Sequence, residues 1–316
     1  MMKTNSLTVN REVKITKGRS VKLLKYWDLY LMVLPAVILI LLFKYMPMYG
    51  VIIAFKDYNL MEGVWGSDWV GFQYFRELFT FDEFPRVVRN TVMISLMKLL
   101  VGFPIPIILA LLLNELKFVR FKRMVQTITY LPHFISWVII GGLAIDMLSP
   151  SSGIINRIIE MLGFDPIFFM SDERIFRWIL VGSDVWKEAG WGAIIYLAAL
   201  IGINEELYQA ATVDGANRFR QIWHISLPGL KSTIIVILLL RIGYILDAGF
   251  EQVLVMYNPT VYDVADIIDT YVFRVGLGSM QFGLTTAAGL FKSVIGCVLL
   301  ILANVFARKM GEEGIF

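Results

Sequence analysis

The sequence predicts an all-α integral membrane protein with six transmembrane helices and both termini in the cytoplasm. Composition is the first reason: of 316 residues, 57% are hydrophobic and only 17% are charged, whereas soluble domains are about half apolar and about a quarter charged. The second reason is that six stretches approach the roughly 20 apolar residues that a helix needs to cross the hydrocarbon core. The third is that lysine and arginine gather in alternate connections, which sets the orientation.

The predicted spans follow one another without an intervening soluble domain. They cover residues 29–55, 87–113, 124–148, 175–201, 233–249 and 284–306. Pro35 and Pro47 interrupt the first span, so its outer end is expected to bend. The connections on the outer side are long and the first is rich in aromatic residues, which favours short helices at the membrane interface.

Sixteen lysines and arginines fall in the N-terminal arm, the second-to-third and fourth-to-fifth connections and the tail, against seven in the other three connections. Because positive residues stay on the cytoplasmic side, the basic arm of residues 1–26 and the tail of residues 308–316 are expected inside. Residues 27–86 then form the first helix and outer loop, and residues 87–307 form the transmembrane domain. The first apolar run is long and has no cleavage pattern, so it is interpreted as a retained signal anchor.

Several classes of protein are disfavoured by what the chain contains. Its single cysteine, Cys297, excludes a disulfide framework, and the two histidines, His133 and His224, lie far apart, so no metal site is expected. The net charge of +3 is too small to indicate nucleic-acid binding. The chain has no G-x-x-x-x-G-K-[ST], H-E-x-x-H or G-x-S-x-G motif, so we assign it no catalytic residue and expect any ATP to be bound by another polypeptide.

Residues 204–228, called segment 204–228 below, form the most informative stretch. Asn204 is a good N-cap, and the acidic residues after it suit the positive end of a helix dipole. Asp214 and Gly215 indicate a turn that ends this helix. A second short helix follows with its apolar residues on one side, and Pro228 leads into the next span. An amphipathic helix pair exposed to the cytoplasm suits a protein partner; the alternative is a pair lying on the membrane surface without one.

The same stretch resembles the EAA motif of bacterial ABC importer permeases. The match comprises Gln209-Ala210-Ala211, Gly215, and then Ile225, Leu227 and Pro228, with every spacing kept. Asp214-Gly215-Ala216 is also similar to the form found in sugar permeases of the maltose-transporter type. The resemblance extends over about residues 87–307 and implies the type I importer permease (MetI-like) fold, in the bacterial cytoplasmic (inner) membrane.

In that family the segment couples the permease to the ATPase. The implied coupling residues are Glu206, Gln209, Ala210, Ala211, Asp214, Gly215, Ala216, Phe219, Ile222, Ile225, Leu227 and Pro228. Gln209 stands where the family usually has glutamate, so the charge-assisted part of docking is lost there. Glu205 or Glu206, about one turn upstream, is the candidate replacement.

Three further stretches, residues 43–57, 130–136 and 265–277, are similar to permeases for polygalacturonan, rhamnogalacturonan and alginate oligosaccharides. The resemblance implies import of an oligosaccharide, which can contain uronate. The implied partners are a second homologous permease, in a heterodimer, two ATP-binding subunits that hold ATP and magnesium, an extracytoplasmic solute-binding protein and membrane lipid. No cofactor is expected on this chain.

Charged residues inside spans are costly and usually face a cavity or a partner. Two sets recur at helical spacing, one in the fourth span and one at the end of the fifth: Asp184, Lys187, Glu188 and Trp191, and Arg241, Tyr244, Asp247 and Glu251. In the family, the corresponding stretches line the translocation cavity. Aromatic rings suit the apolar faces of a sugar, and Lys187 and Arg241 suit a uronate.

The alternative for the fourth-span set is an ion-pair group that holds helices together. Lys98, Asp146 and Lys292 are isolated within their spans and are expected to pair across helix interfaces or to snorkel. His133 is interpreted as a packing residue.

Other functions also fit parts of this pattern. A proton-coupled secondary transporter would use Asp184 and Glu188, an importer permease could carry a non-sugar solute, and a membrane scaffold would tolerate changes at Lys187 and Arg241.

Overall fold

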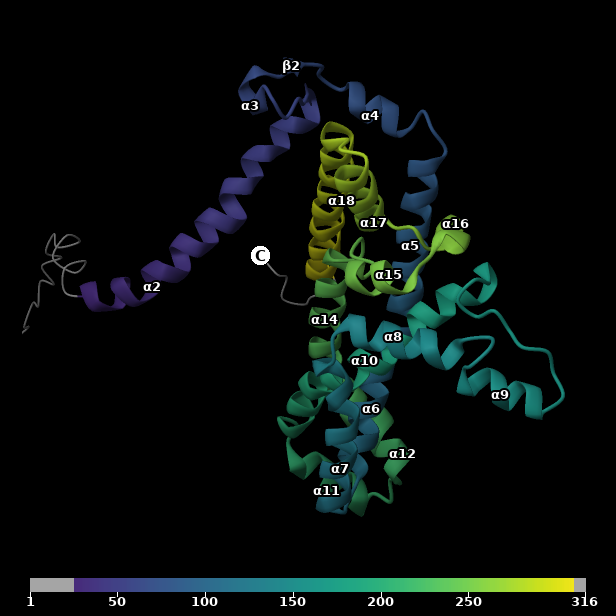
Figure 1. The fold of residues 1–316 in the computed structure, drawn as a ribbon. Coiled ribbons are helices and arrows are strands. Elements are labelled where there is room, and N and C mark those ends of the chain that lie inside the picture. Colours follow the sequence, from purple (N-terminus) through teal and green to yellow (C-terminus); the bar gives the residue numbers. More distant parts are fainter. Residues whose placement is uncertain (1–25, 310–316) are drawn as a thin grey trace, which may run out of the picture. The chain divides into compact units, whose positions relative to one another are not determined.

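The computed structural model describes residues 26–309 (Figure 1), and the chain separates into two compact units that divide between Val51 and Ile52. Residues 1–25 of the expected N-terminal arm lie outside the described residues, and so do residues 310–316 of the expected tail. Each unit is described by itself.

The described part of the first unit is one helical run. It comprises α2 (Trp27–Ile40), the π-helix η1 (Leu41–Tyr45) and the beginning of the 3-10 helix η2 (Met46–Phe55), which crosses the division. The whole run of 29 residues is apolar enough to span a membrane. Pro35 lies inside α2 without ending it. The later part of the run changes from α-helix to π-helix at Leu41 and to 3-10 helix at Met46, directly before Pro47, where a bend is expected.

The second unit begins with a small hairpin that sequence patterns do not predict. Strand β1 (Lys56–Asp57) pairs antiparallel with β2 (Asp68–Trp69), and α3 (Gly63–Gly66) lies between them. Lys56 donates to the carbonyl oxygens of Val64 and Ser67 at 2.8 and 3.1 Å, which fixes the loop. Tyr74, which follows the hairpin, donates its hydroxyl to Asp57 of β1. Burial is the main cause that raises the pKa of Tyr74 to about 12, and this hydrogen bond adds to the shift.

The remainder of the second unit is helical. Its elements are α4 (Gln73–Leu78), α5 (Glu83–Gly102), α6 (Pro104–Glu115), α7 (Val119–Tyr130), η3 (Leu131–Phe134), α8 (Trp137–Leu148), α9 (Ile154–Met161), α10 (Glu173–Ile201), α11 (Glu205–Val213), α12 (Arg218–Gln221), η4 (Ile222–Ser226), α13 (Leu227–Gly229), α14 (Lys231–Gly243), α15 (Phe250–Met256), η5 (Pro259–Val261), α16 (Tyr262–Ala265), α17 (Ile268–Phe273), η6 (Arg274–Gly278) and α18 (Phe282–Lys309).

Within residues 26–309, three helices are long and apolar enough to cross a membrane, or up to five if each bent pair counts as one span. The third predicted span is one of the bent pairs, because its halves meet at 101°. Pro132 lies in the 3-10 turn between them, and the Ser136 hydroxyl accepts from the Ile139 amide to begin a new helix. The residues 124–148 predicted as one span therefore form two helices with a break between them instead of a single straight helix.

The fourth and fifth predicted spans also differ from simple apolar helices. α10 is 29 residues long but is not among the apolar spans, because three charged residues lie within positions 184–188. α14 ends at Gly243, short of the predicted boundary at residue 249, and Gly249 has a left-handed φ of +91° that starts α15 in a new direction.

The core is organised around α10, which packs against α5, α6 and α7. One buried cluster joins Phe176 and Leu180 to Val253 and Met256, and another joins α6 to the second half of α10. α10 and α7 approach closely at Gly190, where an added Cβ would meet the Thr129 carbonyl oxygen. In the second unit, α11 and α12 lie at one end, and α17 and the beginning of α18 lie at the other (Figure 1).

Candidate functional site

Segment 204–228 folds as two short helices joined by a turn. The Asn204 side chain accepts from the Glu206 amide at 3.0 Å and caps α11, as the sequence predicts. Gly215 has φ +76°, in the left-handed region that ends the helix. Asn217 caps α12 by accepting from the Arg220 amide at 2.9 Å. This second cap is absent from our sequence interpretation, although asparagine directly before a helix is its usual signal.

Two side-chain contacts hold the helices of segment 204–228 together. The hydroxyls of Tyr208 and Ser226 lie 2.9 Å apart. Gln221, which is buried, donates to the Thr212 hydroxyl at 2.9 Å. Because each contact joins the first helix to the second, the segment has a defined shape that can transmit a displacement.

Segment 204–228 exposes several large apolar side chains beside polar and charged ones. Val213 is 88% exposed and Phe219 71% exposed, and the Phe219 ring stacks on Trp223 with a centroid distance of 6.4 Å. Of the predicted coupling residues, seven are exposed and five are half-buried. The exposed ones are Glu206, Gln209, Ala210, Asp214, Gly215, Phe219 and Pro228, and the half-buried ones are Ala211, Ala216, Ile222, Ile225 and Leu227. Exposed apolar surface of this kind is typical of an interaction site.

A cavity of about 490 Å³ lies between α5, α6, α10 and α14. Its lining includes six of the eight predicted pathway residues: Asp184, Glu188, Trp191, Arg241, Tyr244 and Asp247. Lys98, Ser95, Phe103, Pro106 and Tyr196 line it as well. The cavity thus combines aromatic rings with carboxylates and cations, and its volume falls in the usual range for ligand sites.

Lys187 and Glu251 do not line this cavity. Lys187 is buried, and its ammonium donates to the carbonyl oxygens of His133 and Ile135 at 2.7 and 2.5 Å. It therefore satisfies the backbone where the third predicted span breaks, rather than facing this cavity. Glu251 is exposed on α15.

Asp184 and Glu188 do not pair with Lys187, so the alternative of a mutual ion-pair set is wrong, but each of the three residues bonds to another element and so helps to hold helices together. Asp184 lies 3.1 Å from Lys98, with side-chain exposures of 16% and 10%. Lys98 also donates to the Ala248 carbonyl oxygen at 2.9 Å and to Gln252. Lys98 pairs across a helix interface as expected, but it lines the cavity too, which sequence spacing does not reveal.

His133 contacts two predicted pathway residues. Its Nδ1 lies 2.9 Å from Glu188 Oε2, and its ring stacks on Trp191 at 4.4 Å with an interplanar angle of 1°. The histidine is packed and has a polar partner, and it fixes the plane of the Trp191 indole beside the cavity. Lys292 pairs with Asp269 as expected for an isolated lysine, whereas Asp146 is exposed.

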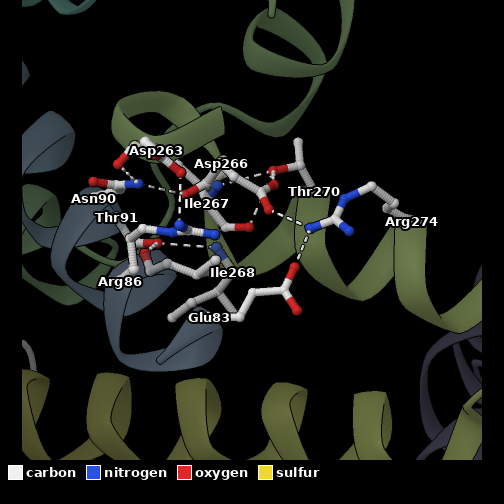
Figure 2. Close-up of polar contacts among 11 residues, drawn as sticks. Glu83, Arg86, Asn90, Thr91, Asp263, Asp266, Ile267, Ile268, Thr270 and Arg274 are labelled. Atoms are coloured by element: carbon white, nitrogen blue, oxygen red, sulfur yellow. Dashed lines mark hydrogen bonds and ion pairs between the residues drawn. The ribbon is translucent and has the colours of Figure 1, made fainter. Parts of the chain in front are cut away.

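A polar network joins the first turns of α5 to α16 and α17 (Figure 2). Arg274 contacts Glu83 at 2.9 Å and Asp266 at 2.6 Å, and Arg86 contacts Asp263 at 2.6 Å. Burial raises the pKa of Asp266, although hydrogen bonds from Thr270 and Arg274 oppose that shift. The sequence interpretation does not single out these residues, because their partners lie far apart along the chain.

Asn90 and Thr91 extend the same network to the backbone. The Asn90 amide donates to the carbonyl oxygens of Asp263 and Asp266, and the Thr91 hydroxyl accepts from the Ile268 amide at 2.9 Å (Figure 2). These contacts satisfy buried backbone groups in an irregular stretch. Within residues 26–309, no group of three or more His, Cys, Asp or Glu side chains is placed to hold a metal ion.

Comparisons with known proteins place this geometry in context. Residues 102–312 match the family model described as binding-protein-dependent transport system inner membrane component. The chain is 49% identical to protein LplB of Bacillus subtilis, over 91% of each chain. It is 48% identical to the polygalacturonan/rhamnogalacturonan transport system permease protein YteP of Bacillus subtilis, over 94% of this chain and 92% of that protein.

A solved structure is similar over nearly the whole fold. It is a chain of the bacterial alginate ABC transporter in complex with an alginate pentasaccharide-bound periplasmic protein. The TM-score is 0.86 at 42% identity, and the match covers 93% of this chain and 99% of that chain.

Proposed function

Because the chain belongs to the binding-protein-dependent transport system inner membrane components, and is a permease of an ABC importer for sugars or oligosaccharides, we propose that its cargo passes through the cavity lined by Asp184, Trp191 and Arg241. One observation carries this proposal. α10 and α14 both line the cavity, and segment 204–228 is the connection between them. A movement of that segment therefore reaches both walls of the cavity directly.

The proposed mechanism is alternating access. Segment 204–228 docks on a separate ATP-binding subunit, and its exposed apolar residues bury on docking. Closure of two such subunits on ATP moves the segment, turns α10 and α14, and opens the cavity to the outer side. Hydrolysis then returns the permease to its resting, inward-facing state. The chain itself binds no ATP or magnesium in this scheme.

The cargo proposed is an oligosaccharide that can contain uronate. The relatives named for polygalacturonan, rhamnogalacturonan and alginate support this choice. Arg241 in the cavity wall is placed to pair with a carboxylate, whereas Lys187, expected for the same role, faces the break in the third span. The cavity's other cation, Lys98, already pairs with Asp184.

The proposed assembly has a second, homologous permease in a heterodimer, two ATP-binding subunits and an extracytoplasmic solute-binding protein. It also places six helices of this chain in the inner membrane, with both termini inside. Five of the six are the apolar spans, with each bent pair counted once. The remaining one is α10, the fourth along the chain, whose residues Asp184, Lys187 and Glu188 face the cavity and neighbouring helices instead of lipid.

The test is sugar uptake into vesicles that contain the complete transporter, with the solute-binding protein outside and ATP inside. Uptake of a short oligogalacturonate is expected to require both and to be unaffected by a protonophore. Uptake by the purified chain alone, driven by a pH gradient, would instead support a proton-coupled transporter.

Trp191 provides a residue-level test in the same assay. Trp191→Ala is expected to lower uptake about tenfold, which corresponds to about 1.4 kcal/mol, because an aromatic surface for the sugar is lost. Trp178→Ala is the matched control, since Trp178 is exposed on the same helix but does not line the cavity. Equal losses in the two variants would contradict the assignment of the pathway.

A further inference from the structure

A second cavity, of about 540 Å³, lies among α15, α17, η6 and α18. Five large apolar side chains form most of its wall: Phe250, Val272, Phe273, Leu277 and Phe282. Three charged side chains, Asp247, Asp269 and Lys292, line it as well. None of these residues except Asp247 belongs to the cavity already described. The second cavity is therefore a distinct space with its own chemistry.

The two cavities share one wall residue. Asp247 lines both of them, in the short connection between α14 and α15. Phe250, the first residue of α15, then lines only the second cavity. Because α17 and the beginning of α18 lie at the end of the unit remote from segment 204–228 (Figure 1), the second cavity lies farther than the first from the proposed ATPase contact.

The polar groups of the second cavity form an ion pair that remains accessible. Lys292 Nζ lies 2.7 Å from both carboxylate oxygens of Asp269. The side-chain exposures are 23% for Lys292 and 26% for Asp269, so the pair is half-buried and open to a ligand. A charged pair in an apolar wall is costly unless it is bonded, and sugar hydroxyls can both donate to the carboxylate and accept from the ammonium.

Two phenylalanine rings in the wall of the second cavity supply an apolar surface beside this ion pair. Phe250 and Phe273 contact each other with ring centroids 5.7 Å apart, and both line the cavity beside the ion pair. Ring faces of this kind pack against the apolar faces of a pyranose, while the charged groups bond to its hydroxyls. A lipid chain would use the rings but would leave the ion pair without a polar ligand.

We propose that this cavity is a second sugar-binding station, at which Phe250 and Phe273 pack against one sugar unit and Asp269 and Lys292 bond to its hydroxyls. An oligosaccharide then occupies both cavities at once, with Asp247 between two of its units. This inference rests on the proposed function, since it extends the same pathway.

The test measures protection of single cysteines by sugar in the complete transporter. Cys297, the only native cysteine, is exposed on α18 and is first replaced by serine. Leu277→Cys then reports on the second cavity and Tyr244→Cys on the first. Met280→Cys is the matched control, because Met280 is 67% exposed, close to the 62% of Leu277, and lies outside the lining of both cavities.

A short oligogalacturonate is added until thiol labelling of Tyr244→Cys slows about tenfold, which mass action gives near ten times the dissociation constant. Labelling of Leu277→Cys is expected to slow by a similar factor, and labelling of Met280→Cys is expected to stay the same. Adding Asp269→Asn and Lys292→Met together should abolish protection at Leu277→Cys and leave that at Tyr244→Cys.

Each other outcome has one meaning. Protection at Tyr244→Cys alone would overturn the second station and leave the proposed function standing. Protection at neither position would contradict the proposed function itself. A Leu277→Cys variant that does not label even without sugar would show that lipid or the second permease fills the second cavity, which also overturns the proposal.

Discussion

Gly215→Val is expected to lower ATP-driven sugar uptake about tenfold while the permease still inserts and assembles. Gly215 has φ +76°, a conformation that costs residues with a Cβ about 1–2 kcal/mol and β-branched residues more. A Cβ at this position meets no atom within 4 Å, so the effect comes from backbone strain alone. The strain changes the angle between α11 and α12, and each 1.4 kcal/mol lost from docking corresponds to a factor of ten.

Two variants make this prediction specific. Gly163→Val introduces the same strain, because Gly163 has φ +85° and equally open surroundings, but it follows α9, far from segment 204–228 in the chain. Its uptake is expected to be normal. Gly215→Asn is expected to restore most of the uptake, since asparagine tolerates the left-handed region. If Gly163→Val were as impaired as Gly215→Val, general instability would explain the loss.

Lys98→Met is expected to give the largest loss among the cavity variants, through both stability and uptake. The lysine is buried and bonds to Asp184, to Gln252 and to the Ala248 carbonyl oxygen. Removing one partner of a buried ion pair leaves an uncompensated charge and costs about 3 kcal/mol. Thermal unfolding of the purified complex and uptake by vesicles both measure the loss.

A double-mutant cycle distinguishes the ion pair from the other contacts of Lys98. Lys98→Met with Asp184→Asn removes both charges, so the double variant should be more stable than the two single losses added together predict. Simple addition of the two losses would show that Lys98 and Asp184 do not interact as the structure has them.

Features with a local cause were predictable from the sequence. The Asn204 cap and the left-handed Gly215 follow from short-range chemistry, and the structure confirms both. The break in the third span has a local signal in Pro132, but hydropathy alone gives a continuous apolar run. The bend also depends on a buried lysine, Lys187, that reaches its carbonyl oxygens from another helix.

The lining of the first cavity was also only partly predictable from the sequence. Lys187 shares a helical repeat with Asp184, Glu188 and Trp191, so spacing places it in the same set. In the folded chain, η3 and the cavity divide that face of α10, and Lys187 lies on the side of η3, where the third predicted span breaks. Lys98 could not be assigned to the cavity from the sequence, because its partner Asp184 lies 86 positions away.

The central claim is that segment 204–228 is the contact through which a separate ATPase drives this permease. A photo-cross-linking amino acid at Ala210, an exposed residue of α11, tests it in the complete transporter. We expect an adduct with the ATP-binding subunit whose yield changes with nucleotide, and no such adduct from the same group at Met61, which is exposed beside α3. Capture of only lipid at Ala210, with the ATP-binding subunits present and active, would contradict the account.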